Sequence, residues 1–151
     1  SDLAKKLSTV NDFYFIGRGV HYPIALEGAL KLKELAYVHA EGFAAGELKH
    51  GTLALIENGT PAIVLNPTDE TYHETLGNAA EMKARGAVIV GVSDRPNQLY
   101  EYHIQLPRID AKIFYPLLEV IPLQIFAYYS AIERLRNPDY PRNLAKSVTV
   151  K

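Results

Sequence analysis

The sequence predicts an α/β fold, a three-layer α/β/α sandwich around a mostly parallel sheet, from two observations. First, three short apolar runs are bounded by Gly, Pro, Asn or Asp, at residues 13–17, 61–67 and 87–94. Their continuous apolar character predicts strands that are covered on both faces, as in a parallel sheet. Second, helical stretches alternate with these strands, and this alternation is typical of α/β sandwiches.

The helical stretches carry start and stop signals. They are expected at residues 23–38, 69–85 and 113–136. Pro23 suits the first turn of a helix, and Thr68 and Asp69 are good N-caps for the second one. Gly86 follows the second stretch, where glycine commonly ends a helix. The run YHIQL, at 102–106, alternates in polarity and could add an edge strand.

Length and composition indicate one globular domain. The 151 residues are 48% hydrophobic and 22% charged, which is enough to bury a core. We expect a single domain over residues 1–151, with a core at about 13–137 and a carboxy-terminal tail at 138–151. Because it makes few tertiary contacts, the tail is a candidate for disorder.

Charge and cysteine content exclude several classes. With 16 basic and 17 acidic residues, there is no electrostatic case for nucleic acid or an anionic membrane as partner. No apolar run approaches the roughly 18 residues that span a bilayer. The chain contains no cysteine, so it has no disulfide framework, which fits a cytoplasmic location.

The first helical stretch carries a charged stripe. At 100° per residue, Glu27, Lys31 and Glu34 fall within about 60° of one another. They could be a solvated face with a Glu–Lys pair at i,i+4. However, apolar residues lie on both sides of the stripe, and a helix that is apolar nearly all round is buried. Buried charges must be paired or face a cavity, and two carboxylates around one ammonium shift each other's pKa, as in acid/base sites.

Three other stretches could carry chemistry. GRGVHYP, at 17–23, joins a strand to a helix, but as a dinucleotide fingerprint it has Tyr22 where glycine is needed. His50 lies beside a glycine and could be structural, exposed or a proton-transfer group. In the tail PRNLAKSVTVK, at 141–151, SVTVK could be an edge strand, or a desolvated Lys146 could attack a carbonyl. The spacing of the five histidines predicts no metal site.

Taken together, three motifs resemble the carboxy-terminal sugar isomerase (SIS) domain of the glutamine–fructose-6-phosphate aminotransferase (isomerizing) family, the glucosamine-6-phosphate synthases. They are ALEGALKLKE at 25–34, HAEGFAAGELKHG at 39–51 and PRNLAKSVTVK at 141–151, in the family's order. The resemblance runs from about residue 13 to the end. It implies an α/β/α sandwich around a five-stranded parallel sheet, without a metal or organic cofactor.

The resemblance also implies a reaction, in which fructose 6-phosphate is opened, aminated with ammonia from glutamine and isomerised to glucosamine 6-phosphate. Lys146 resembles the lysine that forms a Schiff base, and Glu34 the base that moves a proton between the first two sugar carbons. Lys31 and Glu27 match charged neighbours of that base. His50 matches the histidine that assists ring opening from the neighbouring subunit of a homodimer. Ala145 and Lys31 are expected to bind the sugar phosphate.

The chain departs from the family pattern in what it lacks. It has no glutaminase domain, no first SIS domain, and no Ser/Thr cluster in GRGVHYP, so we expect about half a site that is inactive alone. Two alternatives stay open. One is a stand-alone SIS module that binds a phosphosugar without catalysis, and the other is a related sugar-phosphate deaminase or deglycase.

Overall fold

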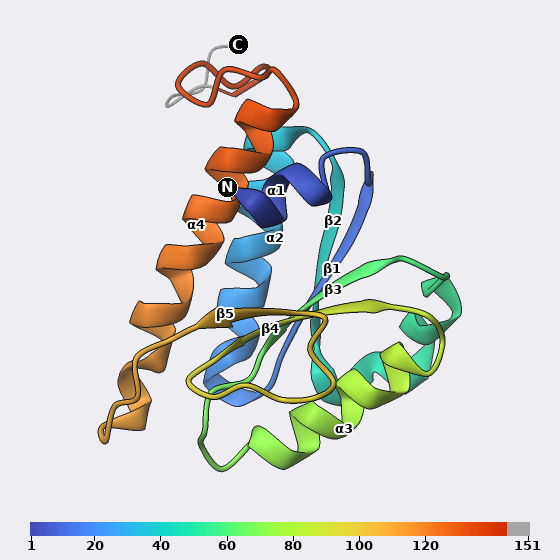
Figure 1. Cartoon of the computed structure of the whole chain (residues 1–151), viewed down its shortest axis with the longest axis vertical. Coiled ribbons are helices and arrows are strands. Elements are labelled where there is room, and N and C mark those ends of the chain that lie inside the picture. Colours follow the sequence, from blue (N-terminus) through green and yellow to red (C-terminus); the bar gives the residue numbers. More distant parts are fainter. Residues whose placement is uncertain (145–151) are drawn as a thin grey trace, which may run out of the picture.

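The computed structural model describes residues 1–144 and shows a three-layer α/β/α sandwich (Figure 1). The central sheet has five parallel strands in the order β2-β1-β3-β4-β5. The strands are β1 Asp12–Gly17, β2 His39–Ala44, β3 Pro61–Leu65, β4 Val88–Ser93 and β5 Tyr102–Gln105. The predicted fold class is therefore confirmed, including the edge position of the strand near residue 102.

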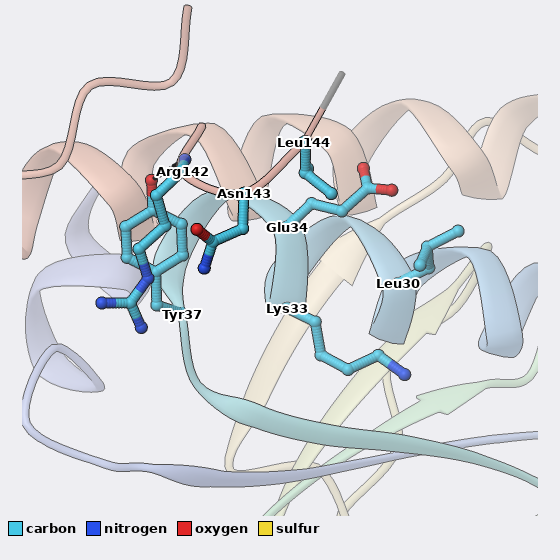
Figure 2. Close-up of a pocket in the computed structure, with 7 residues that line it drawn as sticks. All are labelled: Leu30, Lys33, Glu34, Tyr37, Arg142, Asn143 and Leu144. Atoms are coloured by element: carbon cyan, nitrogen blue, oxygen red, sulfur yellow. Dashed lines mark hydrogen bonds between the residues drawn. The ribbon is translucent and has the colours of Figure 1, made fainter. Parts of the chain in front are cut away.

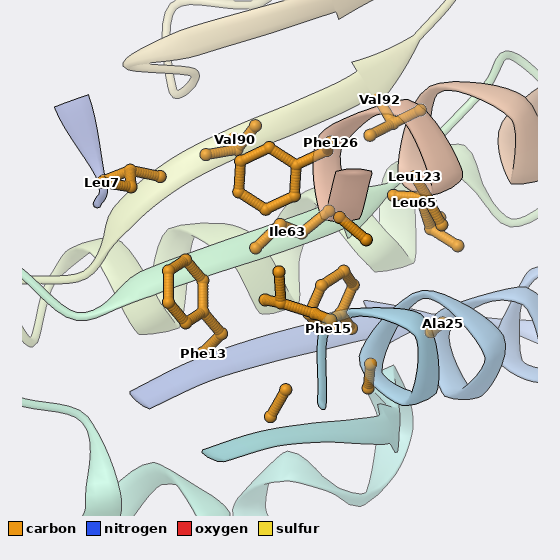
Figure 3. Packing of buried hydrophobic residues seen from close by; sticks show 14 of the residues in the cluster. Leu7, Phe13, Phe15, Ala25, Ile63, Leu65, Val90, Val92, Leu123 and Phe126 are labelled. Atoms are coloured by element: carbon orange, nitrogen blue, oxygen red, sulfur yellow. The ribbon is translucent and has the colours of Figure 1, made fainter. Parts of the chain in front are cut away.

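Helices cover both faces of the sheet (Figure 1). The long helices are α2 Tyr22–Ala36, α3 Tyr72–Lys83 and α4 Tyr115–Glu133, and the short α1 spans Asp2–Lys6. One face packs on α1, α2 and α4, through a core that includes Phe13, Phe15 and Phe126 (Figure 3). The other face packs on α3 and on two short 3₁₀ helices, Ala45–His50 and Thr52–Leu55.

The helix boundaries differ from expectation at both amino- and carboxy-terminal ends. The second helix begins at Tyr72 rather than near Asp69, and neither Thr68 nor Asp69 is its N-cap, which is Thr71. The Asp69 carboxylate instead accepts a hydrogen bond from the Thr71 backbone N–H and pairs with the His21 ring. The first helix ends at Ala36 because Tyr37 takes a left-handed conformation, with a φ of 58°.

Strand β2 was not predicted because its sequence, HAEGFA, mixes polar and small residues and is only half buried. Gly42 explains part of this composition. A Cβ at that position would lie 2.9 Å from the Leu26 backbone, so only glycine lets α2 cross so near the strand. Gly28 acts similarly on α2, since a Cβ there would lie 2.7 Å from the Leu123 side chain of α4.

Helix α4 belongs to a longer apolar segment than the sequence analysis expected. The segment Lys112–Glu133 is long and apolar enough, by length and composition alone, to cross a membrane. One side of α4 nevertheless packs into the core through Leu123, Phe126 and Ala127, and its Glu119 is fully buried in a polar cluster. These contacts are those of a core helix in a globular domain.

Candidate active site

The three charges predicted on the first helix form one cluster on α2. The Lys31 ammonium lies 2.5 Å from Glu34 Oε2 and 3.8 Å from Glu27 Oε1. The hydrogen bond to Glu34, followed by the charges of Glu34 and Glu27, raises the pKa of Lys31 despite partial desolvation. Lys31 is thus held as a cation beside two carboxylates, which suits it to neutralise negative charge rather than to act as a base.

The expectation that this helix is buried all round is wrong. Its far side, Ala25, Ala29, Leu32 and Ala36, packs against the sheet, as the pattern indicated. Leu26 and Leu30, however, are 42% and 41% exposed. The side chains of Lys31 and Glu34 are 28% and 27% exposed, so the cluster lies at the border between core and surface, open to a ligand.

The described part of the tail returns to this helix. The Arg142 backbone N–H donates to the Tyr37 hydroxyl at 2.8 Å, and the Arg142 guanidinium lies 4.3 Å from the centre of the Tyr37 ring. Residues 142–144 therefore lie against α2 and the residue that follows it. They complete a cavity of about 380 Å³ beside Glu34 (Figure 2), lined by Leu30, Lys33, Glu34, Tyr37, Arg142, Asn143 and Leu144.

Two predicted site residues, Ala145 and Lys146, lie outside the described residues, as does the possible edge strand SVTVK. Leu144 stands two residues before Lys146 in the sequence and lines the cavity that contains Glu34.

The structure does not bring His50 to the α2 cluster. His50 ends the 3₁₀ helix Ala45–His50, which packs with α3 on the opposite face of the sheet. Its ring Nδ1 lies 2.7 Å from Glu47 Oε2, and its side chain is 72% exposed. Within one chain, His50 and Glu34 therefore belong to different faces.

A buried polar cluster that the sequence did not reveal lies at the carboxyl edge of the sheet. His21 Nδ1 lies 2.9 Å from Glu119 Oε2, and His21 Nε2 lies 2.7 Å from Asp69 Oδ2. His21 and Glu119 are fully buried, and the Asp69 side chain is 3% exposed. His21 follows β1, Asp69 follows β3 and Glu119 belongs to α4, so the cluster joins three separate segments.

This cluster occupies the point where the strand order reverses, between β1 and β3, where open α/β sheets commonly bind ligands. Burial alone would lower the pKa of His21, but hydrogen bonds and charge from Glu119 and Asp69 outweigh it and raise that pKa. Burial raises the pKa of Glu119. Burial would also raise the pKa of Asp69, but hydrogen bonds from His21 and Thr71 lower it. His21 is thus held between two carboxylates, and the surroundings favour the protonated form of its ring and the ionised form of Asp69.

One signal could have revealed the cluster. Glu119 is the only charged residue between Ile113 and Ile132, and a single carboxylate on an apolar helix requires a partner. His21 and Asp69 gave no such signal, because their sequence positions suggested a turn and a helix cap. Among residues 1–144, no group of three or more His, Asp or Glu side chains is arranged to hold a metal ion.

The Lys31–Glu34 contact leads to a direct prediction. Replacing Glu34 with glutamine should lower the pKa of Lys31, because the hydrogen-bonded carboxylate is the largest cause of its raised value. Replacing Glu27 should lower it less, since that carboxylate is 3.8 Å away. Titration of the Lys31 side-chain carbon resonances by NMR would measure both shifts. Equal shifts in the two variants would contradict the described pairing.

Comparison with known proteins identifies the family. The SIS domain matches residues 6–134. The chain belongs to the SIS domain family. Its sequence is 51% identical over 152 residues to glutamine–fructose-6-phosphate aminotransferase (isomerizing) of Pyrococcus horikoshii, covering 99% of this chain and 25% of the relative. The enzyme of the same name from Methanothermobacter thermautotrophicus is 48% identical, with 99% and 26% covered. The SIS chain thus spans about a quarter of the length of these relatives.

Solved structures agree with this assignment. The C-terminal domain of glucosamine-fructose-6-phosphate aminotransferase from Francisella tularensis superposes with a TM-score of 0.82 at 36% identity, covering 91% of the SIS chain and 40% of that chain. Tagatose-6-phosphate ketose/aldose isomerase from Escherichia coli, 20% identical with a TM-score of 0.78, shares the fold. The resemblance stated from the three sequence motifs is therefore confirmed.

Proposed function

We propose that this SIS domain is the isomerase half of a glucosamine-6-phosphate synthase, which makes glucosamine 6-phosphate from fructose 6-phosphate and glutamine-derived ammonia. The Lys146 amine condenses with the ketone carbon of the open-chain sugar and releases water. Ammonia then adds to this Schiff base and displaces the lysine amine, so the second sugar carbon carries the nitrogen that the product keeps. Glu34 then takes a proton from the first sugar carbon and returns one to the second. Lys31, whose cationic form Glu27 helps to stabilise, balances the negative charge that develops during this transfer.

The observation that carries this proposal is the return of residues 142–144 to α2. They line the same cavity as Glu34, two residues before Lys146. A Schiff base requires an amine at the carbonyl, and proton transfer requires a carboxylate within hydrogen-bond reach of the adjacent carbon. The segment before Lys146 and the base are thus held at one site, with a lysine cation 2.5 Å from that base.

We also propose that the complete site needs a second subunit and two further domains. His50 lies on the opposite face from Glu34, which agrees with a role in the site of the neighbouring subunit of a homodimer. The phosphate is held by a first SIS domain, ammonia comes from a glutaminase domain, and the isolated chain is inactive. We place the whole enzyme in the cytoplasm.

Borohydride trapping tests the Schiff base. The chain is incubated with fructose 6-phosphate and sodium borohydride, alone and with a separately produced first SIS domain, and the adduct is located by peptide mapping. We expect one adduct, at Lys146, that forms only when the first SIS domain is present.

Lys146→Ala should abolish the adduct, whereas Lys151→Ala, at the other tail lysine, should leave it unchanged. Sugar-phosphate binding without any adduct would refute catalysis by this lysine and favour a phosphosugar-binding module.

A further inference from the structure

The residue that follows α2 has a backbone conformation that its side chain disfavours. Tyr37 has a φ of 58° and a ψ of 40°, in the left-handed region, and its N–H donates to the Lys33 carbonyl as the helix ends. Glycine is the usual residue at such a helix end, because a Cβ in this conformation costs free energy. A bulky side chain at a strained backbone position commonly marks a functional role. The ring and hydroxyl of Tyr37 should therefore do something that glycine could not do.

The Tyr37 side chain joins three segments of the chain. Its hydroxyl accepts the hydrogen bond from the Arg142 backbone N–H, at 2.8 Å, and the Arg142 guanidinium lies beside its ring (Figure 2), 4.3 Å from the ring centre. The Arg136 guanidinium, just beyond the end of α4, lies 5.6 Å from the same centre. Both distances are within the range of cation–π attraction. One tyrosine thus connects the end of α2, the end of α4 and the tail.

The connected point of the tail is close in sequence to the residues that reach the cavity. Arg142 is followed by Asn143, whose φ of 62° is left-handed, a conformation that asparagine adopts more readily than most residues. Leu144 comes next and lines the cavity that contains Glu34. Lys146 stands four positions after Arg142, and four residues span at most about 14 Å. The position of Arg142 therefore limits the volume that the Lys146 amine can search.

We propose that Tyr37 is a positioning residue, which anchors the tail so that the Lys146 amine meets the open-chain sugar beside Glu34. This inference rests on the proposed function, because it takes Lys146 as the group that forms the Schiff base. Holding two reacting groups together raises their effective concentration. Loss of the anchor should therefore slow Schiff-base formation. It should leave sugar-phosphate binding unchanged, because another domain holds the phosphate in the proposed function.

Hydrogen exchange and NMR of the isolated chain test the anchor without any reaction. Tyr37→Phe removes the hydroxyl and keeps the ring, whereas Tyr37→Gly removes both and suits the left-handed backbone. We expect the Arg142 amide to exchange about two- to tenfold faster in Tyr37→Phe, the effect of losing one ordinary hydrogen bond, and faster still in Tyr37→Gly. The Leu144 methyl resonances should move toward random-coil positions in the same order. Tyr140→Phe, at an 82% exposed tyrosine of the same tail, should change neither.

Borohydride trapping with fructose 6-phosphate and the first SIS domain tests the positioning. The rate of adduct formation at Lys146 should fall several-fold in Tyr37→Phe and by about tenfold or more in Tyr37→Gly. The fructose 6-phosphate concentration that gives half of the maximal rate should stay the same in both variants. A purely structural role would not produce this separation of rate from binding, nor the intermediate rate of the conservative variant.

The two measurements separate this inference from the proposed function. Unchanged Arg142 exchange in Tyr37→Gly would overturn the anchor, whatever the activity. Normal trapping rates in variants whose tail is released would overturn the positioning role and leave the proposed function intact. Absence of a Lys146 adduct in the unsubstituted protein would instead refute the proposed function, and with it the role of Tyr37 in that reaction.

Discussion

Replacing His21 with leucine should lower the free energy of unfolding by about 3–5 kcal/mol, the cost of removing one partner from a buried ion pair. The change leaves the Glu119 and Asp69 carboxylates facing an apolar side chain in a site that is almost closed to solvent. Since the chain contains no tryptophan, urea unfolding followed by circular dichroism is the suitable measurement.

The protein contains a matched control for this experiment. His39 also contacts two carboxylates, Asp12 at 3.0 Å and Glu41 at 3.3 Å, but its side chain is 51% exposed. His39→Leu should change stability by less than about 1 kcal/mol, because exposed ion pairs contribute little. Glu119→Gln keeps a hydrogen-bonding group at that position and should cost less than His21→Leu. If His21→Leu and His39→Leu were equally stable, the buried cluster would not hold the three segments together.

The same cluster predicts how stability depends on pH. The pKa of His21 is raised above its ordinary 6.5, so its stabilising effect is complete below that pH and is lost as pH rises through the folded-state value. Burial raises the pKa of Glu119, so the contribution of this group to stability is likewise lost as pH rises through its folded-state value. The lowered pKa of Asp69 acts oppositely, and its contribution is lost as pH falls through the folded-state value. Unfolding free energy should therefore decrease above pH 6.5, and His21→Leu should remove that decrease.

Most of the fold was predictable because its strands are buried on both faces. The runs that contain β1, β3 and β4 are continuously apolar, and in a chain with intervening helices this pattern indicates the inner strands of a parallel sheet. Strand β2 was not predictable in this way. It is an edge strand, and Gly42 is required there by the close approach of α2. A requirement of this kind depends on tertiary packing and leaves no periodic pattern in the sequence.

The site residues that lie on one helix were predictable, whereas those that come from separate segments were not. Glu27, Lys31 and Glu34 lie on one helix, so helical geometry alone brings them together in both the prediction and the structure. His21, Asp69 and Glu119 come from three segments up to 98 positions apart, and only the packed fold makes them neighbours. His50 shows that a family motif alone does not place a residue at the site. It belongs to the motif at 39–51, but it lies on the opposite face of the sheet from Glu34.

Replacing Glu34 with glutamine should lower kcat by about 10²–10⁴-fold, the usual effect of removing a general base. The enzyme for this test is a fusion in which this chain follows the portion of the Pyrococcus horikoshii relative that precedes its matched region. Glutamine keeps the shape of the side chain and can still accept a hydrogen bond from Lys31, so KM for fructose 6-phosphate should change little. The measurement is the rate of glucosamine 6-phosphate formation with ammonium as the nitrogen source, which makes it independent of glutamine hydrolysis.

The control for this variant is Glu74→Gln, at an exposed glutamate of α3 on the opposite face of the sheet. If the two variants were equally active, Glu34 would not be the base. The cluster on α2 would then act only through the charge of Lys31. Loss of activity in Glu34→Gln with borohydride trapping at Lys146 intact would instead separate the two steps, because the Schiff base forms before the proton is moved. The paired outcome therefore assigns Glu34 to proton transfer and Lys146 to covalent capture of the sugar.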